Sequence, residues 1–445
     1  MEYFPNILFA LLLIAGIGYF ARNVKKLARN IKLGKEADVS DNSSQRWKNM
    51  AMIALGQSKM VVRPIAGLLH IIVYVGFVII NIEVLEIILD GLLGTHRLFA
   101  FLGPVYNVLI GSFEILAFLV VVAVIIFWIR RNVIRLQRFL KSEMKGWPKK
   151  DGNLILYIEL VLMFLFLTMN AADYQLQLKG AAHYASEAGI MGSFPISGFI
   201  APLFENLSIS SLILVERTAW WLHIVGILLF LNYLYYSKHL HILLAFPNTY
   251  YGNLKPKGQF KNLQSVTNEV KLMMDPEADP FAAPDEDAPE PEKFGASDVA
   301  DLSWVQLLNA YTCTECGRCT SECPANQTGK KLSPRKIMMD TRDRLEAVGK
   351  NIDANKGSFV DDGKQLLDDY ITREELWACT SCNACVEACP VSIDPLSIIM
   401  DMRQYLVMEQ SAAPTDLNNM MGNIENNGAP WPFNQMDRLN WANES

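Results

Sequence analysis

All eight cysteines of this 445-residue chain lie in two groups that share one spacing. The first group is Cys313, Cys316, Cys319 and Cys323, and the second is Cys379, Cys382, Cys385 and Cys389. Each group reads Cys-x2-Cys-x2-Cys-x3-Cys, and a proline follows its last cysteine. Thiolates bind zinc and the irons of iron–sulfur clusters, so the spacing predicts a metal-binding region.

Runs of this form are typical of the paired 4Fe-4S clusters of bacterial ferredoxins, in which three thiolates of one run and the last thiolate of the other hold each cluster. This pattern predicts two ligand sets, the cluster I set and the cluster II set. The cluster I set is Cys313, Cys316, Cys319 and Cys389, and the cluster II set is Cys379, Cys382, Cys385 and Cys323. A pair of zinc sites or a disulfide framework is the alternative. Reduced thiols place this region in the cytoplasm.

The repeat continues beyond the cysteines. The segments 334–342 and 395–403 both begin with proline and carry apolar residues at helical spacing. We therefore expect a cluster loop followed by a helix, used twice, in an α-helical ferredoxin-like domain with two clusters.

The elements before this region are apolar. Charged residues make up 19% of the chain, but this average hides long apolar runs in the first 250 residues. Five runs approach the roughly 20 residues that span a bilayer. They are 7–20, 65–88, 105–129, 154–170 and 219–240. The first run has no basic segment before it and no small-residue cleavage site after it, so a retained anchor is expected rather than a signal peptide.

Loop charge predicts the orientation of this five-helix transmembrane bundle. Lys and Arg are concentrated in the first connection, from Arg22 to Arg63, and in the third, from Arg130 to Lys150. By the positive-inside rule the N-terminus lies outside the cell inner (cytoplasmic) membrane and the iron–sulfur domain lies in the cytoplasm.

The expected domain order follows from these features. The segments are a five-span haem b domain (1–250), an acidic, proline-rich linker (251–300), the dicluster domain (301–410) and a tail (411–445). The linker has too little apolar content to fold on its own.

Histidines in the apolar half predict haem. Imidazole binds haem iron axially, so a b-type haem needs two histidines at similar depth on facing helices. If the fifth helix runs on past residue 240, His70 and His241 could clamp an inner haem. An outer haem would use His223, with His96 as its partner. His239 points off the shared face of His223 and His241, and each of these histidines could instead be a packing residue.

Two carboxylates lie deep in the predicted spans. Glu114 and Glu159 are therefore candidates for quinone binding or proton transfer. No catalytic nucleophile, nucleotide-binding glycine loop or nucleic-acid-binding surface is apparent.

A family resemblance rests on Gly67-Leu68-Leu69-His70, Trp221-Leu222-His223 and the segment 236–241 together with the cysteine runs. The chain resembles the di-haem membrane subunit of respiratory nitrate reductase, as fused in heterodisulfide reductase-like proteins and electron-transfer-flavoprotein:menaquinone oxidoreductases. The nitrate reductase subunit has two histidines on its second span, whereas this chain has only His70.

The resemblance implies electron flow between menaquinone and an electron-transfer flavoprotein or a soluble dehydrogenase. Segments 423–431 and 437–441 are similar to the peptide that joins the cluster domain to a CCG-motif module in fused relatives, so a separate cysteine-rich subunit is expected as a partner. Three functions remain open. They are quinone-linked electron transfer, quinol-dependent reduction of a disulfide as in heterodisulfide reductases, and a membrane anchor that has clusters but no haem.

Overall fold

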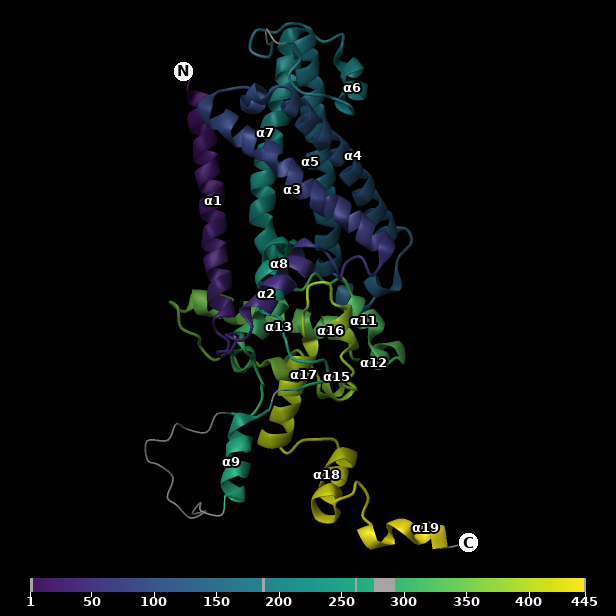
Figure 1. The fold of residues 1–445 in the computed structure, drawn as a ribbon. Coiled ribbons are helices and arrows are strands. Elements are labelled where there is room, and N and C mark those ends of the chain that lie inside the picture. Colours follow the sequence, from purple (N-terminus) through teal and green to yellow (C-terminus); the bar gives the residue numbers. More distant parts are fainter. Residues whose placement is uncertain (1–2, 186–188, 261, 276–292, 444–445) are drawn as a thin grey trace.

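The computed structural model describes residues 3–185, 189–260, 262–275 and 293–443, which form helices and no named β-strand. Five helical segments within the described residues are long and apolar enough to cross a membrane. They are α1 (Phe4–Ile31), α3 (Pro64–Leu93), α4 (Pro104–Asn132), α5 (Trp147–Leu178) and Ile209–Tyr236, which contains α7 (Ile209–Tyr233). Figure 1 shows them as a bundle with the N-terminus at the end far from the cysteine-bearing domain.

Four of these helices begin at or beside a proline, which is tolerated in the first turn because the amide there has no helical acceptor. The fourth helix is much longer than the predicted 154–170. Its polar ends, including Asp151 and Asp173, are buried inside the protein. Hydropathy alone therefore underestimates the length of this helix.

The fifth helix does not continue through His241, contrary to the sequence-based expectation. It ends in two short 3-10 turns, Leu234–Tyr236 and Lys238–Leu240, separated by Ser237 in an extended conformation (φ −117°, ψ 146°). The Ser237 hydroxyl accepts a hydrogen bond from the His239 amide (3.1 Å), and a new helix, α8 (His241–Tyr250), follows. The expectation that His223 and His241 share one helix face is therefore wrong.

The cysteine-bearing region (the cluster domain) consists of short helices around two longer ones. In chain order these are α10 (Trp304–Thr312), α11 (Arg318–Glu322), α12 (Pro324–Gln327), α13 (Pro334–Ala354), α14 (Leu366–Asp369), α15 (Arg373–Trp377), α16 (Ala384–Ala388) and α17 (Pro395–Gln404). As predicted, α13 and α17 begin at Pro334 and Pro395, which open the repeated segments. The equivalent helices α11 and α16 pack against each other.

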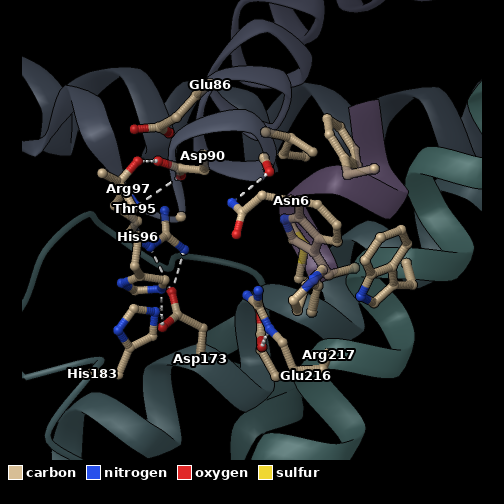
Figure 2. A pocket seen from close by; sticks show the side chains of 18 of the residues that line it. Asn6, Glu86, Asp90, Thr95, His96, Arg97, Asp173, His183, Glu216 and Arg217 are labelled. Atoms are coloured by element: carbon tan, nitrogen blue, oxygen red, sulfur yellow. Dashed lines mark hydrogen bonds and ion pairs between the residues drawn. The ribbon is translucent and has the colours of Figure 1, made fainter. Parts of the chain in front are cut away.

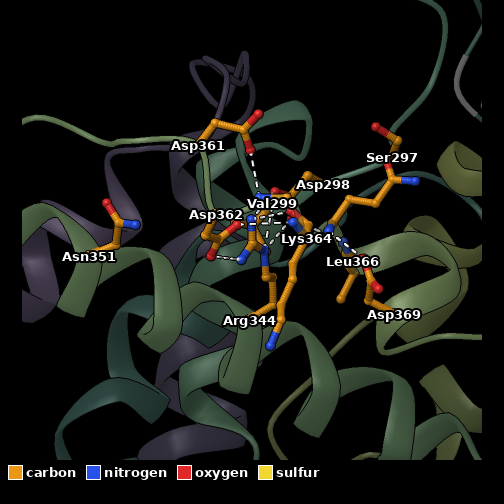
Figure 3. Close-up of polar contacts among 12 residues, drawn as sticks. Ser297, Asp298, Val299, Arg344, Asn351, Asp361, Asp362, Lys364, Leu366 and Asp369 are labelled. Atoms are coloured by element: carbon orange, nitrogen blue, oxygen red, sulfur yellow. Dashed lines mark hydrogen bonds and ion pairs between the residues drawn. The ribbon is translucent and has the colours of Figure 1, made fainter.

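A buried arginine joins the start of the cluster domain to α13 (Figure 3). The Arg344 side chain is fully buried and donates hydrogen bonds to Asp298 (2.8 Å), Asp362 (2.6 Å) and the Lys364 carbonyl (2.6 Å). The end of the expected linker, 293–300, is thus part of the folded domain. The acidic centre of that linker, 276–292, lies outside the described residues.

The cluster domain packs directly on one end of the bundle, which we call the cluster-domain end. Leu27, Leu234 and Leu240 from the bundle share one hydrophobic core with the cluster domain. Across this interface the Asn30 amide donates to the Tyr311 hydroxyl (2.9 Å). The connection between α1 and α3, with α2 (Ser43–Met50) and the π-turn Ala51–Leu55, also lies at this end. The two halves therefore form a continuous structure.

A buried ion pair at this interface gives a testable prediction. The Arg335 guanidinium is fully buried and lies 2.7 Å from Glu143, and the Ser333 hydroxyl donates to the same carboxylate. Glu143→Ala would leave a buried cation without its counter-charge, a change that costs about 3–5 kcal/mol. We expect a lower thermal unfolding midpoint and faster proteolysis between the two halves.

The matched control is Glu374→Ala, which removes the partner of Lys331 from an exposed ion pair. Such pairs contribute little, so no measurable change is expected. Equal destabilisation by the two variants would contradict a special role for the Arg335–Glu143 pair.

Three elements lie apart from both halves. They are α9 (Gln264–Met274), α18 (Thr415–Asn427) and α19 (Asn440–Asn443). Helix α18 has no buried residue, and the tail extends away from the cluster domain in Figure 1.

Candidate metal centres

The two cysteine loops follow the same backbone path. Glu315 and Ser381, at equivalent places between the first two cysteines, both have positive φ (53° and 56°). Gly317 and Asn383, which precede α11 and α16, are also left-handed (70° and 59°). Glycine and asparagine adopt this conformation more readily than other residues, which explains their place in the repeat.

The structure brings the first three cysteines of one run beside the last cysteine of the other. Burial raises the pKa of the Cys319 thiol, and the nearby thiols of Cys316, Cys313, Cys389 and Cys385 raise it further. Burial likewise raises the pKa of Cys313 to about 12 and that of Cys389 to about 11. The other members of the predicted cluster I set thus lie within electrostatic range of Cys319, as does Cys385 of the second run.

The second set is arranged in the same way. The pKa of Cys385 is raised by burial, by Asp394 and by the thiols of Cys379 and Cys323. Burial also raises the pKa of Cys379, which interacts with Cys323 and Cys382. Cys323 thus lies with the second run.

The chemistry of these donors fits iron–sulfur clusters. All eight cysteines are free thiols. Backbone amides point at two of the sulfurs, Ser381 N to Cys379 Sγ (3.4 Å) and Ile393 N to Cys389 Sγ (3.3 Å). Such hydrogen bonds stabilise anionic sulfur in clusters. Among the described residues no three His, Cys, Asp or Glu side chains converge on one metal ion, and a cubane does not require this because each thiolate binds a different iron.

At the cluster-domain end of the bundle, two histidine rings face each other. His70 on α3 and His241 at the start of α8 have ring centres 6.4 Å apart, with a 43° angle between the ring planes. His241 Nδ1 lies 3.1 Å from the Lys238 carbonyl oxygen, which leaves Nε2 available. His70 Nδ1 is buried without a hydrogen-bond partner.

This geometry fits a shared iron. A ring nitrogen bound to a metal lies about 2 Å from it, so two imidazoles on opposite sides of one metal have ring centres roughly 6 Å apart. The second ring nitrogen of a metal-bound histidine commonly donates to a backbone carbonyl, as His241 Nδ1 can do here. His239 is differently placed, with Nε2 3.5 Å from Glu159 and its ring perpendicular to that of His241.

The structure does not bring His223 and His96 together as a facing pair. His223 is buried beside Phe166 (5.9 Å between ring centres), and its Nδ1 has no hydrogen-bond partner. His96 Nε2 lies 3.2 Å from Asp173, and its ring packs against Tyr184 and His183. Within the described part of the chain no ring contact joins His96 to His223.

The two candidate carboxylates have different surroundings. Glu114 is fully buried and accepts hydrogen bonds from the Ile196 amide (2.9 Å), the Ser197 amide (3.0 Å) and the Asn170 side chain (3.2 Å). Glu159 is near His239 and the histidine pair. Glu114 therefore has a structural role in holding the loop before α6 (Ser197–Ile200), whereas Glu159 lies close to the candidate haem site.

Sequence reasoning missed a polar network at the far end of the bundle (Figure 2). Arg97 pairs with Asp173 (2.5 Å). It also donates to the Tyr106 hydroxyl (3.0 Å), which donates to Glu86 (2.8 Å). A cavity of about 340 Å³ lies beside it, lined also by Glu216, Arg217, Trp220 and Trp221. Polar residues near predicted helix ends look like ordinary interfacial residues in a sequence, so no local pattern marks this network.

Residues 312–393, which contain every cysteine, match the family described as the 4Fe-4S dicluster domain. The chain carries such a domain. The match favours iron–sulfur chemistry over the alternatives of zinc sites and disulfides.

Curated relatives match beyond this domain. Over 99% of its length the chain is 28% identical to the probable iron–sulfur-binding oxidoreductase FadF of Bacillus subtilis, of which it covers 61%. Over 94% of its length it is 24% identical to the EtfAB:quinone oxidoreductase of Syntrophomonas wolfei, of which it covers 57%. Over 34% of its length it is 27% identical to one subunit of the dihydromethanophenazine:CoB–CoM heterodisulfide reductase of Methanosarcina mazei, and it covers 37% of that subunit.

The chain thus spans about three fifths of the length of the two relatives that match nearly all of it. No solved structure is significantly similar. The chain is thus similar to iron–sulfur oxidoreductases, and its described residues include five helices apolar enough to cross a membrane.

Proposed function

We propose that this protein carries electrons between a soluble redox partner in the cytoplasm and the menaquinone pool of the inner membrane. Its residues would hold two 4Fe-4S clusters on the crossed cysteine sets and b-type haem on His70 and His241. His223 is the candidate ligand of a second haem, whereas His96, whose Nε2 faces Asp173, does not face His223. Bound clusters and haem would supply one-electron redox chemistry.

One observation carries this proposal. The loop of the cluster I set lies against the bundle next to the histidine pair. Arg318, between Cys316 and Cys319, donates hydrogen bonds to the carbonyls of Lys59 (3.1 Å) and Met60 (3.3 Å). The backbone at Met60 packs on Gly67, one helical turn before His70, and Arg318 is close enough to interact electrostatically with His70.

This placement supports electron transfer between the domains. Successive redox groups must lie near one another, and the cysteine loop and the histidine pair meet at one interface. Reduction of a quinone also takes protons, and Glu159 beside His239 is the candidate carrier at this end of the bundle. The soluble partner, an electron-transfer flavoprotein or a dehydrogenase, is proposed from the similarity to an EtfAB:quinone oxidoreductase.

A second candidate function runs in the opposite direction. The similarity to a heterodisulfide reductase subunit favours a quinol-dependent reduction of a disulfide on a cysteine-rich partner subunit. A clusters-only anchor is the third candidate, and an absorbance spectrum of the purified membrane protein without b-type haem bands would favour it.

The tail is the proposed attachment site for the cysteine-rich subunit. Its aromatic side chains are exposed, with Trp431 46%, Phe433 64% and Trp441 75% accessible. Aromatic side chains of this kind are common anchors of protein interfaces. The menaquinone-linked activity is expected only from the assembled complex.

Deletion of residues 415–445 tests the attachment and the function together. We expect the truncated protein to lose its partner but to keep its iron and haem, because no candidate ligand lies beyond Cys389. Pull-down followed by mass spectrometry measures the partner, and reduction of a soluble menaquinone analogue measures activity.

The control carries Trp431→Ala and Trp441→Ala in the full-length chain and should show the same loss in weaker form. A truncated protein that keeps its partner and its quinone activity would refute the tail as the attachment site. Absence of quinone activity in the intact complex would count against the proposed function itself.

A further inference from the structure

The charges around the two cysteine sets are unequal. On the cluster I side, the buried Arg318 interacts electrostatically with the thiols of Cys316 and Cys389 while its guanidinium is held by the carbonyls of Lys59 and Met60. The bundle therefore positions this cation against the cluster I set.

Two further cations reach the same set from the bundle side. Lys59 lies within electrostatic range of Cys389, and its ammonium donates to the Val386 carbonyl (3.4 Å). Arg138 lies within electrostatic range of Cys316. Arg138 also packs against the cysteine loop, because a Cβ atom added at position 317 would lie only 3.4 Å from the Arg138 Cβ.

Among the described residues, these three cations are not neutralised by direct ion pairs. Within the described residues, Arg318, Lys59 and Arg138 form no ion pair with a carboxylate. Glu387 faces Lys59, but its carboxylate is paired with Lys257 at 2.5 Å. Arg342, which interacts with Cys313, is neutralised by Glu315.

The cluster II set has a different environment. Its nearby cation is Arg403, which donates to the Cys379 carbonyl (2.6 Å) and lies under the Trp377 ring. The negatively charged Asp394 carboxylate interacts electrostatically with the Cys385 thiol, and its charge is opposite to that of Arg403. Cys382 is exposed to solvent. In the part of the chain that the structure describes, this set has no counterpart of the buried Arg318 and the half-buried Lys59 and Arg138 on the cluster I side.

The potential of an iron–sulfur cluster depends on nearby charge, on hydrogen bonds to its sulfurs and on solvent exposure. Reduction adds negative charge, so cations favour the reduced form. Burial alone disfavours added charge, but the same low dielectric strengthens the attraction of neighbouring cations. Amide hydrogen bonds to sulfur occur in both sets and so do not separate them.

We propose that Arg318, Lys59 and Arg138 make cluster I the more easily reduced cluster, so that electrons move from the exposed cluster II to cluster I and then toward the bundle. This inference rests on the proposed function and assigns its direction, from the soluble partner to the membrane. The step is a one-electron transfer that oxidises cluster II and reduces cluster I, with no bond or proton involved. The soluble partner is the reductant.

The test is a redox titration of the full-length protein followed by electron paramagnetic resonance. Cys316→Ser and Cys382→Ser assign the signals of clusters I and II. We expect the midpoint potential of cluster I to be the higher one. Arg318→Gln and Lys59→Gln should each lower it and leave cluster II unchanged, whereas Arg318→Lys, which keeps the charge, should largely restore it.

Arg403→Gln is the matched control and should lower only the potential of cluster II. If Arg318→Gln does not fold, Lys59→Gln still tests whether cation charge sets the potential of cluster I. This variant keeps the Lys59 backbone carbonyl that accepts a hydrogen bond from Arg318. A cluster I potential equal to or below that of cluster II, or one that none of the charge-removing variants shifts, would overturn the inference while leaving the proposed function standing. Absence of 4Fe-4S signals would refute the proposed function and this inference with it.

Discussion

Changing Cys323 to serine is expected to damage the cluster whose other three ligands lie in the second cysteine run. Two 4Fe-4S clusters carry about eight iron and about eight acid-labile sulfide per chain, so loss of one should reduce each to about four. The reason is the proposed crossed arrangement, and Cys323 lies within electrostatic range of Cys379 and Cys385. Iron and sulfide assays of anaerobically purified protein measure the loss.

The pairing is tested by comparing resonance signals among variants. Cys323→Ser and Cys385→Ser should alter the same signal, whereas Cys389→Ser and Cys316→Ser should alter the other. An uncrossed arrangement would pair Cys323 with Cys316 instead. Zinc in place of iron after anaerobic purification would refute the cluster assignment altogether.

Replacing His70 with alanine should abolish at least one b-type haem signal, and His241→Ala should have the same effect. Both rings would be needed to hold one haem iron, and their centres are 6.4 Å apart. Iron–sulfur content should be unchanged, because all proposed cluster ligands are cysteines of the cluster domain. Reduced-minus-oxidised absorbance spectra measure the haem.

Two histidines serve as controls for this prediction. His183→Ala, in the exposed far-end loop, should leave the haem signal intact. His239→Ala should have a smaller effect than His70→Ala, because its Nε2 faces Glu159 rather than the histidine pair. Equal haem loss from His239→Ala and His70→Ala would contradict the proposed ligands.

Local sequence patterns predicted the membrane-length helices, the starts of several helices and the two cysteine loops. Membrane-length helices depend on a continuous apolar surface, and prolines mark where several helices begin, so both can be read from short windows. The cysteine spacing likewise reflects the backbone path of each loop, including the left-handed Gly317 and Asn383. The crossed ligand sets stay a prediction, and the interactions of Cys389 with Cys319 and of Cys323 with Cys379 are ones that it requires.

Only the tertiary structure showed how the bundle and the cluster domain are joined. The sequence suggested a domain tethered beyond a linker, yet Arg335, Tyr311 and Arg318 anchor it to the bundle through contacts between residues distant in the chain. Each of these residues resembles an ordinary surface side chain until its partner is known. Their burial results from the close approach of two separate surfaces.

The histidine pair shows the same distinction. The presence of His70 and His241 could be read from the sequence, but the break at Ser237 and the new helix that begins at His241 could not. The polar network around Arg97 was also hidden, because its partners come from different helices. The hydrophobic periodicity of a sequence describes one helix at a time. Which side chains from different helices come together is decided by packing and by the need of buried polar groups for hydrogen-bond partners.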